Sequence, residues 1–412
     1  MMNFRFWYGV MGAVPFGAVT SQTLLDVMIS LLFLAWIFIY WRADSKSSHR
    51  ISWTGIEWAF IGYLMVIIAG FIFSASPEAE VTWSLKKFVW LPHFYIFIYA
   101  LKQLRLDRLT LLKYFSIVFL LPNIYALICY LLGYDIVTGI VNERVIGLVS
   151  SATYHAHANG IVFVFFSAFL FLSYQHLSRN MKIMTVLAYT IFALSVFLTF
   201  TRGIWAAILV STILMYTLFS YRLSVKILIG AGAVAAISFF TWPQFNERIQ
   251  HSLSIEKNHE RADLFMVNYQ MFFEHPFLGI GYDENKRRVR EYWDRIGMPD
   301  DYIISHAHNQ FVNVLSTTGL LGLLFFLYIF SFFLKTNWQL IKNTSRTLTP
   351  VRHMFLFACM WAQLEFILGC LTDVSFEYAK IRELILIVWA LVIAIKLKPE
   401  IIVEDGVKIN VA

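Results

Sequence analysis

Residues 311–334 read FVNVLSTTGLLGLLFFLYIFSFFL and contain no charged side chain. A helix needs about 20 mainly apolar residues to cross the hydrocarbon core of a bilayer, so this stretch is long enough to span a membrane. In lipid, backbone polar groups must be paired within the protein, and a helix pairs them within a single segment. We therefore expect residues 311–334 to form a transmembrane helix.

Comparable apolar runs recur along the whole chain. They are Leu24–Trp41, Ile56–Phe73, Phe88–Leu101, Leu109–Leu132, Gly160–Tyr174, Met184–Phe200, Gly203–Phe219, Val225–Phe240, Met354–Leu371 and Leu384–Ile395. A weaker candidate, Phe4–Thr20, is short and is interrupted by glycine and Pro15. With that segment included, the sequence predicts an all-α polytopic membrane protein of about twelve transmembrane helices.

The composition agrees with lipid as the main solvent. Of 412 residues, 59% are hydrophobic and only 14% are charged, whereas about 25% of the residues of soluble domains are charged. The mean hydropathy is +0.65. The net charge of +7 comes largely from Lys and Arg in short connections, so we assign it to membrane topology and expect no nucleic-acid partner. The three cysteines, Cys129, Cys359 and Cys370, lie in apolar runs without ligand spacing, which argues against a disulfide framework or a zinc site.

Basic residues in the short connections predict the orientation of the chain. In a twelve-helix arrangement they all fall on one side, which is cytoplasmic by the positive-inside rule, as are both termini. These residues are Arg42, Lys46, Arg50, Lys102, Arg105, Arg108, Arg179, Lys182, Arg222, Lys226, Lys335, Lys342, Arg346, Arg352, Lys396 and Lys398. No cleavable signal peptide is evident, so we expect the first spans to direct insertion.

One long polar segment, Trp242–His308, falls on the opposite, periplasmic side. It divides the chain into N-terminal transmembrane helices (1–241), a periplasmic segment (242–308), C-terminal transmembrane helices (309–397) and a cytoplasmic tail (398–412). Within the segment, the apolar pattern of Asp263–Phe273 predicts an amphipathic helix lying on the bilayer.

Some basic residues lie on the side that should be poor in them. Lys86 and Lys87 begin a span, Arg202 lies in the turn Thr201-Arg202-Gly203, and Arg261 opens the amphipathic segment. Ionisable groups at the edge of a membrane bundle are costly unless they are paired or used. Lysine at a helix end commonly reaches the headgroups instead. For Arg202 the functional and the structural interpretation are about equally supported by these residues.

A second pattern begins where the long segment enters a membrane helix. His308-Asn309 is followed by nine residues and then by Gly319-Leu-Leu-Gly322, and we expect the glycines to permit close helix packing. A lone histidine at a helix start is more often structural, and His306 lies nearby. Upstream, Glu274–Gly281 reads EHPFLGIG and predicts a helix that ends in a turn.

Further histidines lie in Tyr154–Asn159, which reads YHAHAN. Two histidines at i and i+2 do not share a helix face, so a metal pair is not expected unless the segment is extended. Contacts to sugar hydroxyls are an alternative to interface packing, which we favour. The acidic residues of the long segment show no divalent-metal pattern. We therefore expect no metal and no cofactor.

Taken together, the motifs around Arg202, Arg261–Gly281 and His308–Gly322 resemble those of the O-antigen ligase family, which comprises the WaaL-type ligases and the related O-antigen polymerases. In layout the resemblance extends from Ser84 to about Glu383. Leu323 departs from the small or β-branched residue usual after the second glycine, and this departure weakens the ligase assignment relative to the polymerase.

The resemblance implies a multi-pass glycosyltransferase of the bacterial inner membrane, with a GT-C-like architecture and an active site facing the periplasm. The donor would be a glycan on undecaprenyl pyrophosphate, and the acceptor of a ligase would be lipid A-core. The implied mechanism is metal-independent and inverts the anomeric carbon. Arg202 and Arg261 would bind the pyrophosphate with help from Lys86, His308 would act as base or acceptor positioner, and Asn309 would contact substrate.

Two alternatives remain open. A polymerase of the same family would use another carrier-linked glycan as acceptor. A lipid-linked glycan transporter or flippase would move the carrier without catalysis, but transporters often place ionisable groups near the middle of the membrane. Here the charges gather at the periplasmic surface, with Glu365 as an exception. The sequence does not indicate an oligomeric state.

Overall fold

The computed structural model describes residues 4–42, 52–73, 88, 90–136, 139–140, 144–149, 151–253, 259–295, 297, 306–344 and 350–403, and these are almost wholly helical. The helices of the first half are α1 (Phe4–Thr20), α2 (Gln22–Arg42), α3 (Glu57–Phe73), α5 (Trp90–Leu101), α6 (Arg108–Leu132), α7 (Ala152–Ser173), α8 (Arg179–Phe197) and α9 (Arg202–Phe219). Those of the second half are α10 (Tyr221–Thr241), α11 (Pro243–Leu253), α12 (His259–Glu274), α13 (Asn285–Arg295), α14 (Gln310–Thr344), α15 (Pro350–Cys370) and α16 (Ala379–Leu397). The short elements are an antiparallel pair, β1 (Tyr134–Asp135) and β2 (Gly139–Ile140), and the 3-10 turns η3 (Gly147–Val149), η4 (Tyr174–His176) and η6 (Pro399–Ile401). The prediction of an all-α fold is confirmed.

Each apolar run of the sequence lies wholly or largely in one of these helices. Within the described residues, six helices are long and apolar enough to cross a membrane: Gln22–Arg42, Ala152–Ser173, Arg179–Phe197, Tyr221–Thr241, Gln310–Asn343 and Val351–Cys370. Shorter apolar helices of 10–17 residues are Phe6–Thr20, Glu57–Phe73, Trp90–Leu101, Val118–Leu132 and Arg202–Leu218. The structure thus supports a helical membrane protein, and the number of twelve spans remains a prediction.

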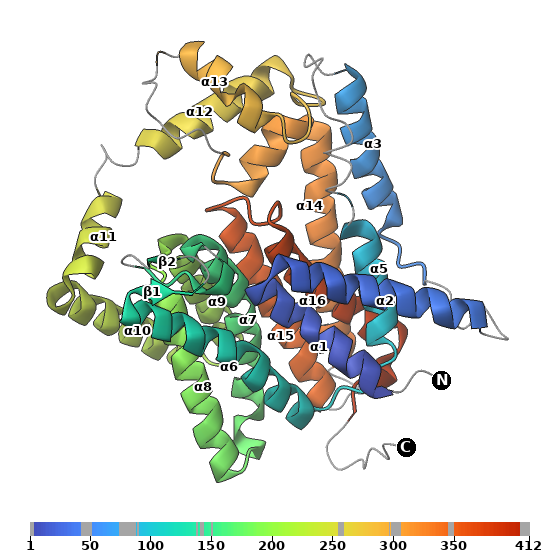
Figure 1. Ribbon diagram of the computed structural model, residues 1–412, viewed down its shortest axis with the longest axis vertical. Helices are drawn as coiled ribbons and strands as arrows, with labels where there is room; N and C mark the ends of the chain where they lie inside the picture. The colour runs from blue at the N-terminus through green and yellow to red at the C-terminus, as the bar shows by residue number, and fades with distance from the viewer. Residues whose placement is uncertain are drawn as a thin grey trace.

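Helices α7, α15 and α16 form the centre of the bundle, as Figure 1 shows. Helix α15 packs along α7, α16 packs against α5, and α3 packs against α14. In the 18-residue apolar stretch of α7, 83% of the residues are buried, whereas in that of α10 only 6% are buried. Large side chains on the outer helix remain exposed, among them Ile229 and Phe240. Such a surface would be costly in water and is suited to lipid.

Helix α14 is interrupted at Gly319, whose φ of 65° and ψ of −168° are not helical. The turn after α12 lies against this break. The N–H groups of Ile280 and Gly281 donate to the carbonyl oxygens of Ser316 and Thr317 at 3.0 and 3.1 Å. Carbonyls that the interrupted helix would leave unpaired are thereby satisfied, as buried backbone groups require. The turn that follows α12 is therefore fastened to the first half of α14.

Glycine is needed on both sides of this contact. A Cβ atom at Gly279 would lie 2.5 Å from the backbone nitrogen of Thr318, and one at Gly319 would lie 2.6 Å from that of Leu278. Both glycines also have positive φ, which side chains disfavour. The expectation that Gly319 packs two helices together is therefore wrong: it admits a loop backbone into a helix break. Gly322 instead leaves room for the side chain of Thr318 in the same helix.

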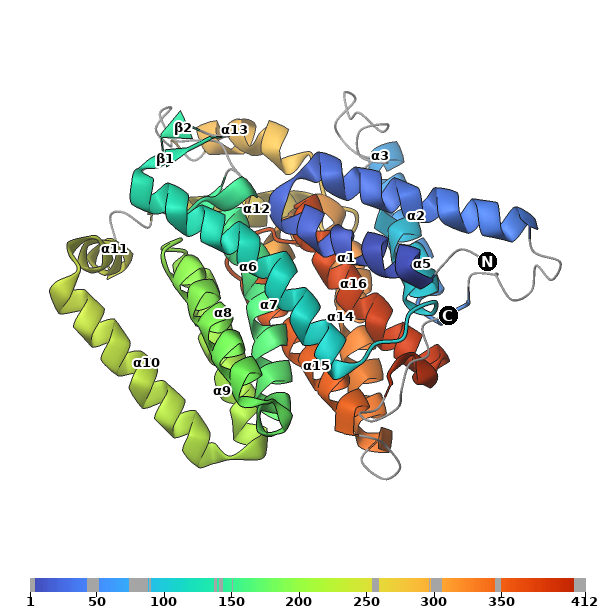
Figure 2. The same ribbon diagram turned by 60° about the horizontal axis from the view of Figure 1, so that its bottom comes forward.

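Among the described residues between α10 and α14, three helices, α11, α12 and α13, lie at one end of the bundle (Figures 1 and 2). The sequence predicts α12 as an amphipathic helix on the bilayer. The predicted stretch, Asp263–Phe273, is helical, as part of α12. Its buried apolar side chains pack against α13 in one cluster, while Met266 and Phe273 remain exposed, so its position on the bilayer stays a prediction. The cluster comprises Leu264, Val267, Met271, Ile280, Val289, Tyr292 and Trp293.

Candidate active site

Three arginines line one cavity of about 430 Å³. They come from separate parts of the chain: Arg144 precedes η3, Arg202 begins α9, and Arg261 lies in the first turn of α12. Including these, the lining residues are Arg144, Thr153, His157, Phe200, Thr201, Arg202, Gly203, Arg261, His308, Thr372 and Asp373. Three guanidinium groups against one carboxylate make this lining strongly cationic, so the cavity suits an anion with several oxygens.

The tight turn between α8 and α9 places Arg202. Phe200 has a φ of 51°, and Thr201 is the N-cap of α9. A Cβ atom at Gly203 would lie 2.6 Å from the Cβ of Thr372, so glycine lets α9 begin directly against the loop before α16. The positive end of the α9 dipole therefore adds to the field of the Arg202 guanidinium in the cavity.

Arg144 is held against the same turn. Its Nε donates to the carbonyl oxygen of Thr199 at 2.7 Å, and its Nη2 donates to the hydroxyl of Thr201 at 3.1 Å. These bonds fix the guanidinium beside the start of α9. Arg144 was not predicted as a site residue, although it is a basic side chain on the predicted periplasmic side, which should be poor in them.

The contact between the α12 turn and the α14 break relates Arg261 to His308. Arg261 lies two residues after the start of α12, and His308 lies two residues before the start of α14. Because the C-terminal turn of α12 is hydrogen-bonded to α14, neither helix can shift along the other without breaking several backbone bonds. The contact that the glycine motifs permit therefore fixes α12, which carries Arg261, relative to the start of α14, which carries His308.

His308 faces a buried carboxylate. Its Nδ1 lies 3.6 Å from Oδ1 of Asp373, and its backbone has a φ of 48°. The His308 side chain is 29% exposed, whereas that of Asp373 is 6% exposed. Both side chains line the cavity, and the imidazole is the more accessible of the two.

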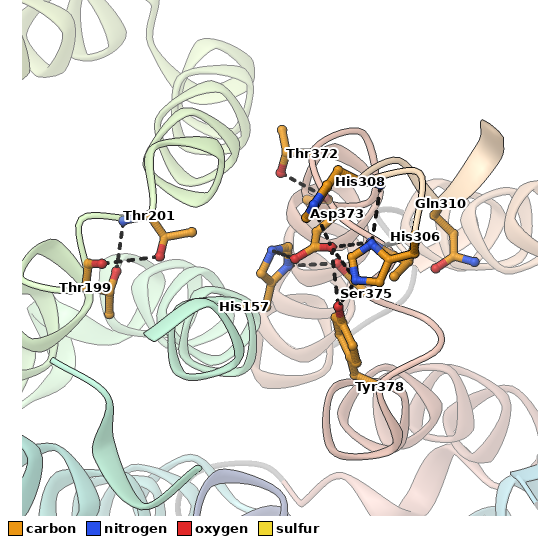
Figure 3. Close-up of polar contacts among 12 residues, drawn as sticks. His157, Thr199, Thr201, His306, His308, Gln310, Thr372, Asp373, Ser375 and Tyr378 are labelled. Carbon is orange, nitrogen blue, oxygen red and sulfur yellow. Dashed lines mark hydrogen bonds and ion pairs between the residues drawn. The ribbon is translucent and has the colours of Figure 1, made fainter. Parts of the chain in front are cut away.

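Asp373 is surrounded by three imidazoles (Figure 3). Besides His308, Nε2 of His306 lies 3.7 Å from Oδ1, and Nε2 of His157 lies 3.9 Å from Oδ2. The N–H of Val374 also donates to Oδ1 at 2.8 Å. Burial would raise the pKa of the carboxyl, but the contact with His308 and the charges of the histidines outweigh it and lower the pKa to about 2. Asp373 is therefore an anion at every physiological pH.

His306, His308 and Asp373 could also hold a metal ion. One ligand atom of each lies within 4.8 Å of the others, and two imidazoles with a carboxylate are a common ligand set for zinc. In the structure, however, Nε2 of His306 is also 2.5 Å from the hydroxyl of Tyr378. A metal bond through Nε2 would replace that hydrogen bond.

The side chain of Asn309 forms hydrogen bonds with backbone groups of two segments. Its Oδ1 accepts hydrogen bonds from the N–H groups of Phe311 and Val312 at 2.9 and 3.1 Å, and its Nδ2 donates to the carbonyl of Leu371 at 3.0 Å. It thus caps α14 and ties it to the loop that carries Asp373. Asn309 is not among the residues that line the cavity, so its predicted contact with substrate remains a prediction.

The histidines of Tyr154–Asn159 have different surroundings. Nε2 of His155 is hydrogen-bonded to the hydroxyl of Ser195 at 2.9 Å, which is the interface packing that we favoured. His157 lines the cavity, and its Nδ1 is 2.8 Å from the hydroxyl of Ser375. The predicted contribution of Lys86 lies outside the described residues.

The fold and the site together define a class of protein: a helical membrane protein with a cationic cavity that also presents an imidazole backed by a carboxylate. Residues 186–327 match the family profile described as O-Antigen ligase. The match includes the motifs at Arg202, Arg261–Gly281 and His308–Gly322, and it confirms the resemblance that these motifs indicate. The family points to a ligase- or polymerase-type activity. No individual curated protein showed significant similarity to the chain.

Proposed function

We propose that this protein is an O-antigen ligase. It transfers a glycan from undecaprenyl pyrophosphate to the lipid A-core oligosaccharide at the periplasmic face of the bacterial inner membrane. The observation that carries the proposal is that Arg202, Arg261 and the His308–Asp373 pair line one cavity. The family match covers the three motif-bearing segments and supports the same assignment.

The arginines act on the leaving group. Pyrophosphate on the anomeric carbon is already a good leaving group, so the site needs positive charge rather than a general acid. Arginine binds phosphate oxygens through paired, charge-assisted hydrogen bonds. Arg202 and Arg261 bind the pyrophosphate, and Arg144 keeps the α8–α9 turn in place beside it.

His308 acts on the acceptor. The Asp373 carboxylate attracts the proton of Nδ1, which leaves Nε2 with a free lone pair. That nitrogen takes the proton of the acceptor hydroxyl. At the same time the hydroxyl oxygen bonds to the anomeric carbon, and the bond from that carbon to pyrophosphate breaks. The distance of 3.6 Å is long for a hydrogen bond, but catalytic hydrogen bonds often shorten only when substrates are bound. A single displacement of this kind inverts the anomeric configuration.

The assignment is tested by giving purified protein a radiolabelled carrier-linked glycan with and without lipid A-core. We expect carrier consumption and labelled lipopolysaccharide only when lipid A-core is present. A glycan that lengthens on its carrier would identify a polymerase, the alternative that the family and Leu323 leave open. Carrier that crosses the membrane without being consumed would identify a transporter.

The topology of the chain gives an independent test. The proposed GT-C-like arrangement has about twelve spans. In it, residues 1–241 and 309–397 are membrane domains, residues 242–308 are periplasmic and residues 398–412 are cytoplasmic. The three natural cysteines are buried, so the background of labelling should be low. Asp294→Cys in α13 should react with an impermeant maleimide applied to the periplasmic side. Gln175→Cys, in the turn after α7, should react only after the membrane is permeabilised. The reverse pattern would contradict both the topology and the location of the site.

Metal independence gives a further prediction. If His308 is the base, EDTA should leave the rate of transfer unchanged, because the imidazole nitrogen needs no metal to accept a proton. The measurement is the initial rate before and after chelation, followed by addition of Zn²⁺, Mn²⁺ or Mg²⁺. Loss of activity that one of these ions restores would assign the cluster of His306, His308 and Asp373 to a metal instead.

A further inference from the structure

Two imidazoles lie at the same carboxylate oxygen. Nε2 of His306 is 3.7 Å from Oδ1 of Asp373, and Nδ1 of His308 is 3.6 Å from the same atom. The two rings lie edge to face, with centroids 4.6 Å apart. By distance alone, Asp373 suits either histidine as the base. Another group must therefore decide which imidazole the carboxylate serves.

The hydroxyl of Tyr378 contacts both His306 and Asp373, as Figure 3 shows. Its oxygen is 2.5 Å from Nε2 of His306 and 3.5 Å from Oδ1 of Asp373. Tyr378 is the N-cap residue of α16, and its ring lies against that of Tyr154 with centroids 4.1 Å apart. Burial and the charge of Asp373 raise the pKa of Tyr378, so the hydroxyl keeps its proton and remains a hydrogen-bond donor.

The hydrogen bonds around His306 determine which of its ring nitrogens carries the proton. The backbone N–H of His308 donates to Nδ1 of His306 at 3.4 Å, so Nδ1 is the accepting nitrogen. In a neutral imidazole the other nitrogen then carries the proton. The Nε2–H of His306 therefore donates to the oxygen of Tyr378, whose O–H donates to Oδ1 of Asp373. His306 thus bonds to the tyrosine, although the carboxylate lies only 3.7 Å away.

We propose that Tyr378 selects His308 as the base by engaging His306. The inference rests on the proposed function, in which His308 takes the proton of the acceptor hydroxyl. Without the tyrosine hydroxyl, the Nε2–H of His306 would turn to Oδ1 of Asp373 and compete with His308 for that oxygen. A carboxylate supports a base by orienting the imidazole and stabilising its positive charge, and a second donor weakens both effects. Tyr378 is thus a positioning residue that acts through His306 and Asp373.

The proposal predicts a loss of rate that a second substitution reverses. Tyr378→Phe removes only the hydroxyl and should lower kcat about tenfold, a part of the 10²–10⁴-fold that a general base contributes. The affinity for the donor should not change, because the arginines hold the carrier. His306→Ala removes the competing donor, so the double variant Tyr378→Phe/His306→Ala should transfer glycan as fast as His306→Ala alone. Such non-additivity is the mark of two side chains that act through one contact.

Tyr282→Phe is the matched control for loss of a buried tyrosine hydroxyl. The hydroxyl of Tyr282 donates to Glu377 at 3.0 Å, so this variant also removes a contact with the loop before α16, but at another carboxylate. Any loss of rate in Tyr282→Phe should persist when His306→Ala is added. A wild-type rate in Tyr378→Phe, or a double variant no faster than Tyr378→Phe, would overturn the proposal.

A measurement without substrates separates this proposal from the ligase assignment. Diethyl pyrocarbonate modifies neutral imidazoles, and the rate at the partly exposed His308 is followed by mass spectrometry at about pH 8, where an unperturbed histidine is neutral. The rate should fall in Tyr378→Phe and recover in the double variant, because the carboxylate makes the imidazole more nucleophilic. This pattern in a wild type that transfers no glycan would support the role of Tyr378 and contradict the ligase assignment. Glycan transfer by a wild type whose His308 reactivity does not depend on Tyr378 would contradict the proposal alone.

Discussion

Replacing Arg202 or Arg261 by alanine is expected to abolish or nearly abolish glycan transfer while the protein still inserts in the membrane. Both guanidinium groups line the cavity in which we place the pyrophosphate. A charge-assisted hydrogen bond contributes about 1.5–3 kcal/mol, so the loss of one contact lowers the rate roughly ten- to a hundredfold. Arginine contacts to phosphate are frequently paired, so removal of the whole group should cost more.

The arginine variants are measured by lipopolysaccharide ladders in cells and by transfer rates of purified protein at matched amounts. Arg202→Lys keeps the charge but loses the paired geometry, so its rate should lie between those of the wild type and the alanine variant. Arg179→Ala, at the opposite end of α8, is the control for loss of a membrane-edge arginine and should be normal. Near-normal ladders from either Arg202→Ala or Arg261→Ala would remove that residue from the pyrophosphate site.

The sequence predicted most of the helices because their signal is local. Each apolar run is long relative to a helical turn, and lipid leaves the backbone few alternatives to a helix. Arg202, Arg261 and His308 were predicted because short motifs surround each of them. In the structure the glycines Gly203, Gly279 and Gly319 of these motifs permit close approach of distant chain segments.

The break at Gly319 illustrates what local patterns cannot show. The residues around it are uncharged and read as continuous helix, and the helix resumes after the break. The interruption is stable only because the turn after α12 supplies hydrogen bonds across it. Those donors lie in another part of the chain, so helix propensity at Gly319 carries no information about them.

Other residues of the site were not predicted from the sequence for the same reason, because distant parts of the chain bring them together. Arg144, His157 and Asp373 lie outside the three motif-bearing segments and far from one another in sequence. They meet because Arg144 is bonded to the α8–α9 turn and because Thr372 packs against Gly203. Such contacts depend on the packing of the whole bundle, and a carboxylate such as Asp373 has no distinguishing neighbours in the sequence.

Replacing His308 by alanine is expected to stop transfer without weakening donor binding. In the proposed mechanism the arginines hold the carrier and His308 acts on the acceptor, so the two functions should separate. General-base assistance typically contributes about 10²–10⁴-fold, so the loss should be large but not total. Transfer rates and carrier affinity are measured separately on purified protein, and equal loss of both would indicate a collapsed site instead.

The pH dependence of the rate should follow the imidazole and not the carboxylate. The pKa of Asp373 is about 2 in the folded protein, below the value of about 3.9 usual for an unfolded chain. Its stabilising contribution is therefore present above about pH 4 and is lost only as the pH falls towards 2. A loss of rate above about pH 4 then does not report protonation of Asp373. Asp373→Asn should change this profile, because the amide cannot hold the positive charge that develops on His308.

The comparison that decides the role of His308 is His308→Gln against His308→Ala. Glutamine keeps hydrogen-bonding capacity but has no basic nitrogen. Capping of α14 does not explain a need for histidine, because Asn309 already accepts the hydrogen bonds of Phe311 and Val312. If His308 only positions the acceptor, the glutamine variant should retain most of the activity. If it removes the proton, glutamine should be nearly as inactive as alanine, with donor binding intact in both. High transfer activity in the glutamine variant would therefore exclude the base and leave a positioning role for His308.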